Sequence, residues 1–456
     1  MKIKSAQLWL LPVTMRMPLK FGSQIMDRVV CARTRVTLED ANGNLAQGWG
    51  ETPLSVAWVW PSSLDYWERE EALKAFCRRI SHALPSAGLS GHPMEMGYDF
   101  MEGPLPDLLA ALNAGRDREA AMPYLAALVC FSLFDIAIHD AFAVANGVSV
   151  YDIYSRDWMS RDLAHYFNDG RFAGKYPAEF LVDSPSRQLP VWHLVGGLDP
   201  IAENDLTGDE PDDGHPVLLK DWIRRDGLNC LKIKLRGDDA EWDYARLVAI
   251  GLICHEEKVD WLTTDFNCTV TDPAYVNAIL DRLCHEQAPT YQKILYVEQP
   301  FPYDLEAHSI DVHSVSARKP LFMDESAHDW RYVKRGRELG WTGVALKTCK
   351  TQTGAILSLC WAKAHGMTLM VQDLTNPMLA QIPHVLLAAH ASTIMGVESN
   401  AMQFYPEASA PEEAVHPGLF RRRNGILDWS TVGKTGFGYR VETIGRTLPE
   451  PVALGG

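Results

Sequence analysis

From about residue 189 onward, short apolar runs alternate with stretches of helical periodicity. The runs are LPVWHLV, NCLKIKL, VDWLTTDFN, ILYVEQPF, KPLFMDES, GVALKT, TLMVQD and TIMGVES. Apolar runs of this length are typical of buried strands, and most of them are followed by a helical pattern. Eight strands that alternate with helices predict a closed parallel β/α barrel. The alternative is a doubly wound open sheet, but no G-x-G-x-x-G motif opens a helix after the first strand.

The residues before this alternation predict a separate α+β unit. Residues 1 to about 60 have the pattern of strands with a turn at ANGN, and residues from about 64 to 145 have a helical pattern. Residues from about 155 to 188 are rich in Gly, Pro and aromatic residues and predict a long loop or insertion. We therefore expect four parts: an N-terminal α+β domain (1–150), an insertion (151–188), the barrel (189–415) and a C-terminal segment (416–456).

The most apolar segment, residues 120–145, is long enough to suggest a membrane span. Asp135, His139 and Asp140 lie inside it, and ionisable groups at that depth are costly in lipid. We therefore interpret the segment as a buried helix of a soluble domain. Asp135 and His139 are four residues apart, on one face of that helix, and we expect them to form a structural pair.

Composition and charge exclude further classes of protein. The chain has 456 residues, of which 47% are hydrophobic and 22% charged, as in ordinary globular proteins. Its formal net charge of −15 argues against a nucleic-acid surface, which needs a basic face. Nine cysteines without a C-x-x-C pair suit reduced thiols better than a disulfide framework. We expect a cytoplasmic protein that binds neither nucleic acid nor a membrane.

Charged residues stand at the ends of the apolar runs, where a β/α barrel places its active site. Successive members of this series are 23 to 33 residues apart, which is about one strand and one helix: Lys234, Asp265, Glu298, Asp324, Lys347, Asp373 and Glu398. A single acidic residue after a strand is more often a helix cap or a loop residue than a ligand. Three carboxylates on successive strands, with lysines on the strands to either side, are hard to explain by capping. We expect Asp265, Glu298 and Asp324 to converge.

The run LKIKL places Lys232 and Lys234 on one face of a strand and three apolar residues on the other. Taken alone, this is typical of an edge strand with a solvated face. Beside three carboxylates the two lysines indicate a catalytic site, because hard oxygen ligands suit Mg²⁺. The metal can stabilise the charge that develops when a carbon next to a carboxylate loses its proton. A lysine base must be neutral, and a second ammonium group lowers its pKa. We therefore expect Lys234 to be the base and Lys232 its auxiliary, with Lys347 on the opposite face.

The motifs K-I-K, D-F-N, V-E-Q-P, M-D-E-S and L-K-T-C-K together resemble the enolase superfamily, in particular its muconate lactonizing enzyme branch. The resemblance covers nearly the whole chain: MRMPLKFG and GNLAQGWGETPL resemble the N-terminal capping domain, FDIAIHDAFAVANGVSVYDIY its closing helix, and TGFGYRVE the C-terminal strand that returns to it. It implies a modified TIM barrel with an α+β capping domain. It also implies Mg²⁺ ligands at Asp265, Glu298 and Asp324, an acid/base pair of Lys234 and Lys347, and Lys232 as the auxiliary lysine.

The chain departs from the family pattern at two places. The mandelate racemase branch has a histidine after the seventh strand, where this chain has Asp373, and the usual G-G after the sixth strand is replaced by T-Q-T-G-A. The choice of Asp324 over Glu325 as the ligand rests on analogy alone.

Two capping-domain loops are expected to select the substrate, LKFGSQIMDR and ETPLSVAWVWPSS, with Met26, Trp58 and Trp60 as an apolar lid. We also predict that Asn267, Asp373, Glu398 and Trp58 contact the substrate.

These features predict a Mg²⁺-dependent enzyme that removes a proton next to a carboxylate of a small molecule. Two lysines on opposite faces favour a racemase or epimerase. Dehydration of an acid sugar and cycloisomerisation share the same first step and stay open. So does a barrel that has lost activity and serves for binding. We expect a homo-oligomer.

Overall fold

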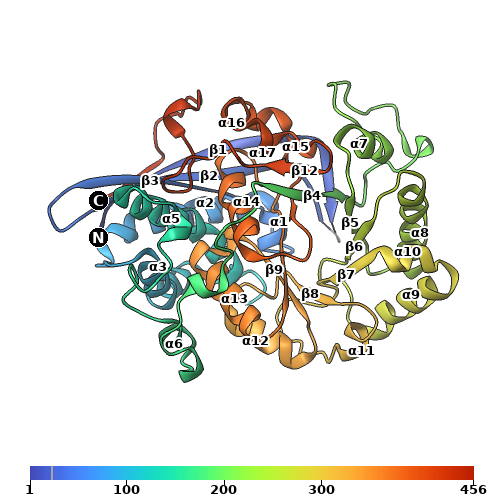
Figure 1. Cartoon of the computed structure of the whole chain (residues 1–456), viewed down its shortest axis with the longest axis horizontal. Helices are drawn as coiled ribbons and strands as arrows, with labels where there is room; N and C mark the ends of the chain where they lie inside the picture. Colours follow the sequence, from blue (N-terminus) through green and yellow to red (C-terminus); the bar gives the residue numbers. More distant parts are fainter. Residues whose placement is uncertain (22–23) are drawn as a thin grey trace.

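The computed structural model describes residues 1–21 and 24–456. Figure 1 shows the N-terminal elements gathered on one side of the molecule and the barrel elements on the other. The C-terminal segment runs back over the N-terminal sheet, so both ends of the chain lie on the same side (Figure 1).

The N-terminal sheet is antiparallel, with strand order β13-β1-β2-β3. Its strands are β1 (Lys2–Phe21), β2 (Gln24–Glu39), β3 (Leu45–Pro53) and β13 (Ala453–Gly455). Five helices complete this unit: α1 (Val56–Val59), α2 (Tyr66–Ser86), α3 (Pro93–Glu102), α4 (Pro104–Asn113) and α5 (Tyr124–Asn146). Because β13 supplies an edge of this sheet, the capping domain is built from both ends of the chain.

Helix α5 is the core helix of the capping domain, and β3 lies directly against it. A Cβ atom at Gly48 would come within 2.1 Å of the Ala141 nitrogen, and one at Gly50 within 1.9 Å of the Leu133 oxygen. These two glycines allow the backbones of β3 and α5 to touch. Within the described residues, α5 is the one helix long and apolar enough to cross a membrane, and 94% of its most apolar stretch is buried inside the fold. The interpretation of this segment as a buried helix is confirmed.

The second sheet is parallel along the path β10-β9-β8-β7-β6-β5-β4-β11. Its strands are β4 (Gln188–Val195), β5 (Cys230–Lys234), β6 (Trp261–Asp265), β7 (Ile294–Glu298), β8 (Leu321–Met323), β9 (Gly343–Leu346), β10 (Thr368–Val371) and β11 (Val397–Glu398). The two ends of the path meet, because the Ile394 N–H just before β11 donates to the Leu369 oxygen of β10 at 2.7 Å. All eight predicted strands are present and the predicted barrel with a capping domain is confirmed.

Helices follow the barrel strands around the outside (Figure 1). They are α7 (Leu219–Asp226), α8 (Ala240–Glu256), α9 (Pro273–Glu286), α10 (Ala288–Lys293), α11 (His313–Ser316), α12 (Trp330–Leu339), α13 (Gln352–Ala364) and α14 (Gln381–Ala391). Shorter elements complete the chain: α6 (Leu163–Phe167) in the predicted insertion, then α15 (Ala401–Phe404), α16 (Ala410–Val415), α17 (Pro417–Phe420) and the strand β12 (Ile426–Asp428), which pairs with β4.

The predicted C-terminal strand at TGFGYRVE is wrong. Residues 435–442 form a bend, a turn, irregular backbone and the start of a 3-10 helix (Val441–Thr443) instead, with one isolated bridge at Gly436. Their backbone is tied to α5, since the Phe437 N–H donates to the Asp140 carboxylate at 2.7 Å. The strand that returns to the capping sheet comes later, as β13, which pairs with β1.

Candidate functional site

The predicted residues stand side by side at the carboxyl ends of the barrel strands. Lys234, Asp265 and Glu298 are the last residues of β5, β6 and β7, and the parallel register pairs each with the next. Asp324 and Lys347 directly follow β8 and β9. The β/α repeat of the sequence therefore brings these side chains to one end of the barrel.

The Lys232 ammonium group lies among three carboxylates. Its Nζ atom is 2.7 Å from Glu298 Oε1, 3.2 Å from Asp265 Oδ2 and 3.3 Å from Glu398 Oε2. Lys232 is 2% exposed, so these ion pairs are shielded from solvent. Two of the three predicted metal ligands thus point at one buried cation.

The third predicted ligand, Asp324, is held on the other side of the site. Its carboxylate lies 2.8 Å from Lys347 Nζ and 3.0 Å from Lys350 Nζ. Lys234 pairs with Asp265 at 2.5 Å. Sequence reasoning missed Lys350. It is the second lysine of L-K-T-C-K, three residues after Lys347 in a 3-10 turn (Thr348–Lys350), and that spacing could have indicated it.

Burial and ion pairing compete in setting the pKa values at this site. Burial opposes ionisation of Asp265, but Lys234 and Lys232 outweigh it and lower the pKa of the carboxyl. Burial and the neighbouring charge of Asp265 instead raise the pKa of Glu298 well above its usual range. Burial would lower the pKa of Lys347, but the Asp324 carboxylate raises it. Lys347 is therefore an ammonium ion in this arrangement and not the neutral amine expected of a base.

Six buried carboxyl groups and four buried ammonium groups meet at this end of the barrel. The carboxyl groups belong to Asp265, Glu298, Asp324, Glu325, Asp373 and Glu398, and the ammonium groups to Lys232, Lys234, Lys347 and Lys350. Six minus four leaves an excess of two negative charges when every group is ionised. One divalent cation carries the charge that would balance this excess, and carboxylate oxygens are the ligands that Mg²⁺ prefers.

The donor atoms are compatible with a metal, although they are not arranged as a finished site. In the described part of the chain no three His, Cys, Asp or Glu side chains form a group that could hold a metal ion. The ammonium groups of Lys232 and Lys347 stand between the carboxylates that would have to do so. Asn267 Oδ1 and Glu325 Oε2 are buried without a hydrogen-bond partner. The donor chemistry fits Mg²⁺, and the metal role of Asp265, Glu298 and Asp324 stays a prediction.

A cavity of about 40 Å³ joins the barrel to the capping domain at this end. Lys232, Lys234 and Lys347 line its barrel side, together with Asp324, Asp373 and Glu398. Leu19, Phe21, Met26 and Trp58 line its capping side. Part of the predicted loop LKFGSQIMDR, residues 22–23, lies outside the described residues. Seven of the ten predicted site residues line this cavity, and Asp265 and Glu298 form ion pairs with its lysines.

Trp58 connects the capping domain to both halves of the site. Its Nε1 atom donates to Glu325 Oε1 at 2.9 Å, and Lys347 Nζ lies 4.4 Å from the centre of its ring. Burial and the charge of Asp324 raise the pKa of Glu325 to about 7. Trp60, the other tryptophan predicted in the lid, does not line the cavity. It is 1% exposed, and its ring packs under Arg116.

The remaining predicted contact residues differ in how free their side chains are. The Asp373 carboxylate accepts hydrogen bonds from the backbone N–H groups of Asn376 and Asn400, at 2.8 and 2.6 Å. Glu398 accepts from Asn400 Nδ2 at 2.8 Å. Asn267 lines an adjoining cavity instead of the first one. Asp373 and Glu398 therefore face the cavity with carboxylates that already have local partners.

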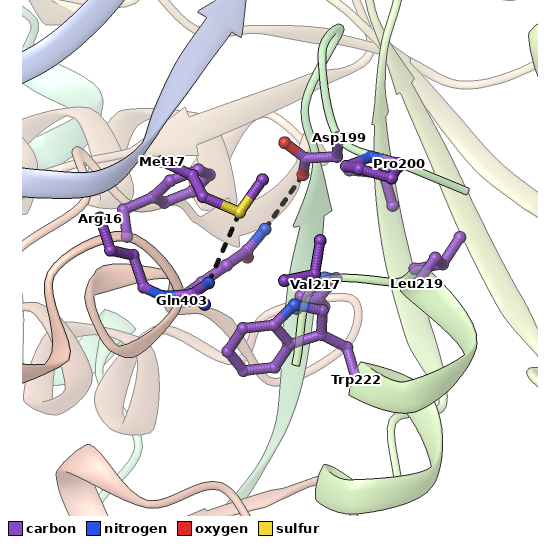
Figure 2. Close-up of a pocket in the computed structure, with 11 residues that line it drawn as sticks. Arg16, Met17, Asp199, Pro200, Val217, Leu219, Trp222 and Gln403 are labelled. Atoms are coloured by element: carbon purple, nitrogen blue, oxygen red, sulfur yellow. Dashed lines mark hydrogen bonds between the residues drawn. The ribbon is translucent and has the colours of Figure 1, made fainter. Parts of the chain in front are cut away.

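A second cavity lies beside β4, between β1 and α7 (Figure 2). Arg16 and Met17 stand on one side of it and Trp222 on the other, while Gln403 Nε2 donates to Asp199 Oδ2 at 3.1 Å. Its volume of about 10 Å³ is about the space of one water molecule. None of the predicted site residues lines it, so it is not the substrate site.

Comparison with known proteins agrees with this architecture. Residues 217–443 match the family model described as enolase C-terminal domain-like. No curated protein matches the chain significantly in sequence.

Many solved structures share the fold. The L-Ala-D/L-Glu epimerase from Bacillus subtilis, in a substrate-liganded complex, is 19% identical over 96% of this chain and 98% of that chain, with a TM-score of 0.64. The muconate lactonizing enzyme from Pseudomonas fluorescens, complexed with muconolactone, is 15% identical over 98% and 97%, with a TM-score of 0.61. A putative mandelate racemase/muconate lactonizing enzyme from Roseovarius nubinhibens, complexed with magnesium, is 18% identical over all of both chains, with a TM-score of 0.63.

The three comparisons with structures concern the fold, since identities are below 20%. The family match covers the barrel strands from β5 to β11, which carry every lysine and carboxylate of the site. The resemblance expected from the motifs is confirmed. The barrel segment of the chain, residues 217–443, belongs to the enolase C-terminal domain-like family.

Proposed function

We propose that the protein removes the proton next to a carboxylate of a small molecule, in a Mg²⁺-dependent reaction through an enediolate, and that the overall reaction is a racemisation or epimerisation. The observation that carries the proposal is the position of Lys234 and Lys347. Both line the same cavity, and their strands β5 and β9 are four steps apart in a ring of eight. Two amines on opposite sides of one cavity suit proton removal on one face and proton return on the other.

Asp265, Glu298 and Asp324 are the residues that would hold Mg²⁺. When bound, the metal would supply positive charge to the substrate carboxylate and so stabilise the enediolate. Lys232, between Glu298 and Glu398, supplies a further buried positive charge beside the same carboxylates.

The two lysines have similar partners, since each is paired with one of the carboxylates that would hold Mg²⁺. Lys347 pairs with Asp324, and Lys234 pairs with Asp265. One lysine would take the proton from one face of the α-carbon, and the other would deliver a proton to the opposite face of the enediolate carbon. In the reverse direction the two roles exchange, and the proton count of the pair is restored after each turnover.

Two other reactions begin with the same proton transfer. Dehydration of an acid sugar would follow if a β-hydroxyl group left the enediolate, and cycloisomerisation would follow the reaction of the muconate lactonizing enzyme among the structural neighbours. A barrel used only for binding is the fourth possibility. The buried, charged and mutually paired side chains argue against it, because an unused site would not need four lysines in a desolvated environment.

Hydrogen exchange tests the proposal. The protein is incubated in D₂O with Mg²⁺ and a panel of chiral carboxylic acids, and deuterium at the α-carbon is followed by NMR. With Lys347→Ala we expect exchange of one enantiomer to persist and exchange of the other to disappear. Lys434→Ala removes an exposed lysine and serves as the control. Loss of a β-hydroxyl with formation of a keto acid would show a dehydratase, and absence of both exchange and Mg²⁺ binding would show a binding protein.

We further propose a cytoplasmic location and a homo-oligomeric state. None of the nine cysteines forms a disulfide bond, which suits a reducing compartment.

A further inference from the structure

Two cavities adjoin at the predicted site, and their walls differ. The inner cavity, of about 40 Å³, contains the three lysines of the proposed mechanism. The outer cavity, of about 270 Å³, is lined by residues from the capping domain and from the loops after β6, β7 and β8. Phe21 and Trp58 line both. A space of about 40 Å³ holds only a few water molecules, so it can take a carboxylate group and its α-carbon, while the rest of a substrate must extend past Phe21 and Trp58 into the outer cavity.

The charged groups of the inner cavity all come from the barrel. Its apolar lining consists of Leu19, Phe21, Met26 and Trp58 from the capping domain and of Leu194 and Leu374 from the barrel. Each of its lysines is already paired: Lys232 with Glu298, Lys234 with Asp265 and Lys347 with Asp324. The positive charge of the cavity is thus confined to the end where the reacting carboxylate would bind.

The outer cavity has no cation among the described residues that line it. Pro61, Pro302 and Tyr303 provide apolar surface, while Gln24, Asn267 and Thr269 are polar but uncharged. Its one charged group is the Glu325 carboxyl, whose Oε2 atom is buried and has no hydrogen-bond partner. A second negative group on a substrate would therefore find no cation on these walls and would lie near another carboxylate.

We infer that the substrate is a monocarboxylate whose remaining part is uncharged, and that the site rejects dicarboxylates. This inference rests on the proposed function, because it takes the lysine end as the place of the reacting carboxylate. The physical reason is desolvation. An anionic group placed in the outer cavity would lose its water without gaining a cation, which costs far more than burying an apolar group of the same size.

A matched pair of probes tests the inference. Phenylacetate and 4-carboxyphenylacetate share the reacting group and the ring and differ by one distal carboxylate. Binding of each to the protein with Mg²⁺ is measured by titration calorimetry, and exchange of the α-protons in D₂O by NMR. We expect phenylacetate to bind at least about tenfold more tightly. Equal or tighter binding of 4-carboxyphenylacetate, or no binding of phenylacetate at millimolar concentration, would overturn the inference.

The exchange measurement separates this inference from the proposed function. Tight, selective binding of phenylacetate with no α-proton exchange would leave the substrate class standing and contradict the proposed chemistry. Exchange of the α-protons that is faster with 4-carboxyphenylacetate than with phenylacetate would support the proposed chemistry and contradict the inferred substrate class.

A variant with an added cation provides a second test. Tyr303→Arg places a guanidinium group on the wall of the outer cavity, and we expect it to tighten 4-carboxyphenylacetate binding by about tenfold or more while weakening that of phenylacetate. Leu454→Arg adds the same charge at a residue that is 58% exposed on β13, and should change neither. Pro61→Lys repeats the test from the capping side if Tyr303→Arg does not fold. Unchanged preference in a folded variant would contradict the inference.

Discussion

The Asp135 carboxyl group provides a quantitative test of how the capping domain is held to the barrel. Asp135 lies on α5 and is fully buried. It accepts two hydrogen bonds from Thr353 at the start of α13, from the backbone N–H and from Oγ1, both at 2.8 Å. Burial raises its pKa to about 7, although these hydrogen bonds oppose the shift. Replacing it by asparagine keeps an acceptor for the N–H and a donor for Oγ1 but removes the titration.

The sign of the pH effect follows from the two pKa values. In the unfolded chain the carboxyl has an ordinary pKa of about 3.9, so between about pH 4 and pH 7 the folded protein holds a proton that the unfolded chain has released. Stability therefore decreases as the pH rises through this range and levels off above about pH 7. At about 1.36 kcal/mol for each pH unit, the Asp135 carboxyl lowers the free energy of unfolding by about 3 kcal/mol between about pH 5 and pH 8. Asp135→Asn should lose about 3 kcal/mol less than the wild type over the same interval.

Urea unfolding of both proteins at the two pH values, followed by circular dichroism, measures this difference. Asp107→Asn removes an exposed carboxyl group of α4 and should follow the wild type. If Asp135→Asn and the wild type lose the same stability, the two hydrogen bonds from Thr353 keep the carboxylate ionised throughout, and the argument from burial fails.

Three further substitutions test local features of the fold. Thr351 has φ 74° and ψ 147°, a region that favours glycine. In thermal unfolding, Thr351→Gly should therefore be more stable than Thr351→Ala by about 1 kcal/mol. The reverse order of stability would show that the backbone at Thr351 is not strained. Trp58→Phe removes the donor to Glu325 and should lower stability by about 1 to 3 kcal/mol, whereas an unchanged melting temperature would mean that the bond contributes nothing. Gly48→Ala forces a Cβ atom against the backbone of α5 and should lower the free energy of unfolding by at least about 3 kcal/mol. Gly445→Ala adds a Cβ atom in open space and should leave the stability unchanged. Equal stabilities of the two variants would contradict the close approach of β3 and α5.

The barrel was predictable because its signal is local. Each strand is a short apolar run next to a helical pattern, and the repeat distance alone places the polar residue that follows each run at the same end of the sheet. The C-terminal strand was not predictable in this way. β13 has three residues, and its partner Leu8 on β1 lies at the other end of the chain. A strand this short is specified by its place in a sheet and not by its own pattern.

The candidate site was predictable as a set of residues but not as a set of contacts. The motifs identify which strand ends carry charge, and Lys234 and Asp265 do lie together as expected. They do not identify the partner of each lysine, because that depends on side-chain lengths and on the distances across the barrel. Lys350 is an example: its spacing from Lys347 could have indicated it as a candidate, but only the fold shows that its ammonium group meets the Asp324 carboxylate, 26 residues earlier in the chain.

The balance of charge explains why lysines occupy the centre of the site. A buried carboxylate without a counter-charge is far less stable than one that is paired, and four of these six carboxylates pair with a lysine. Lys232 lies between Asp265, Glu298 and Glu398, and burial together with the charge of Asp265 raises the pKa of Glu298. The charged residues were visible in the sequence, but the excess of carboxyl groups over ammonium groups becomes meaningful only once the fold shows that all ten groups share one desolvated end of the barrel. Protonation of Glu298 and Glu325, whose pKa values are raised, is one way to relieve that excess, and a divalent cation would be another.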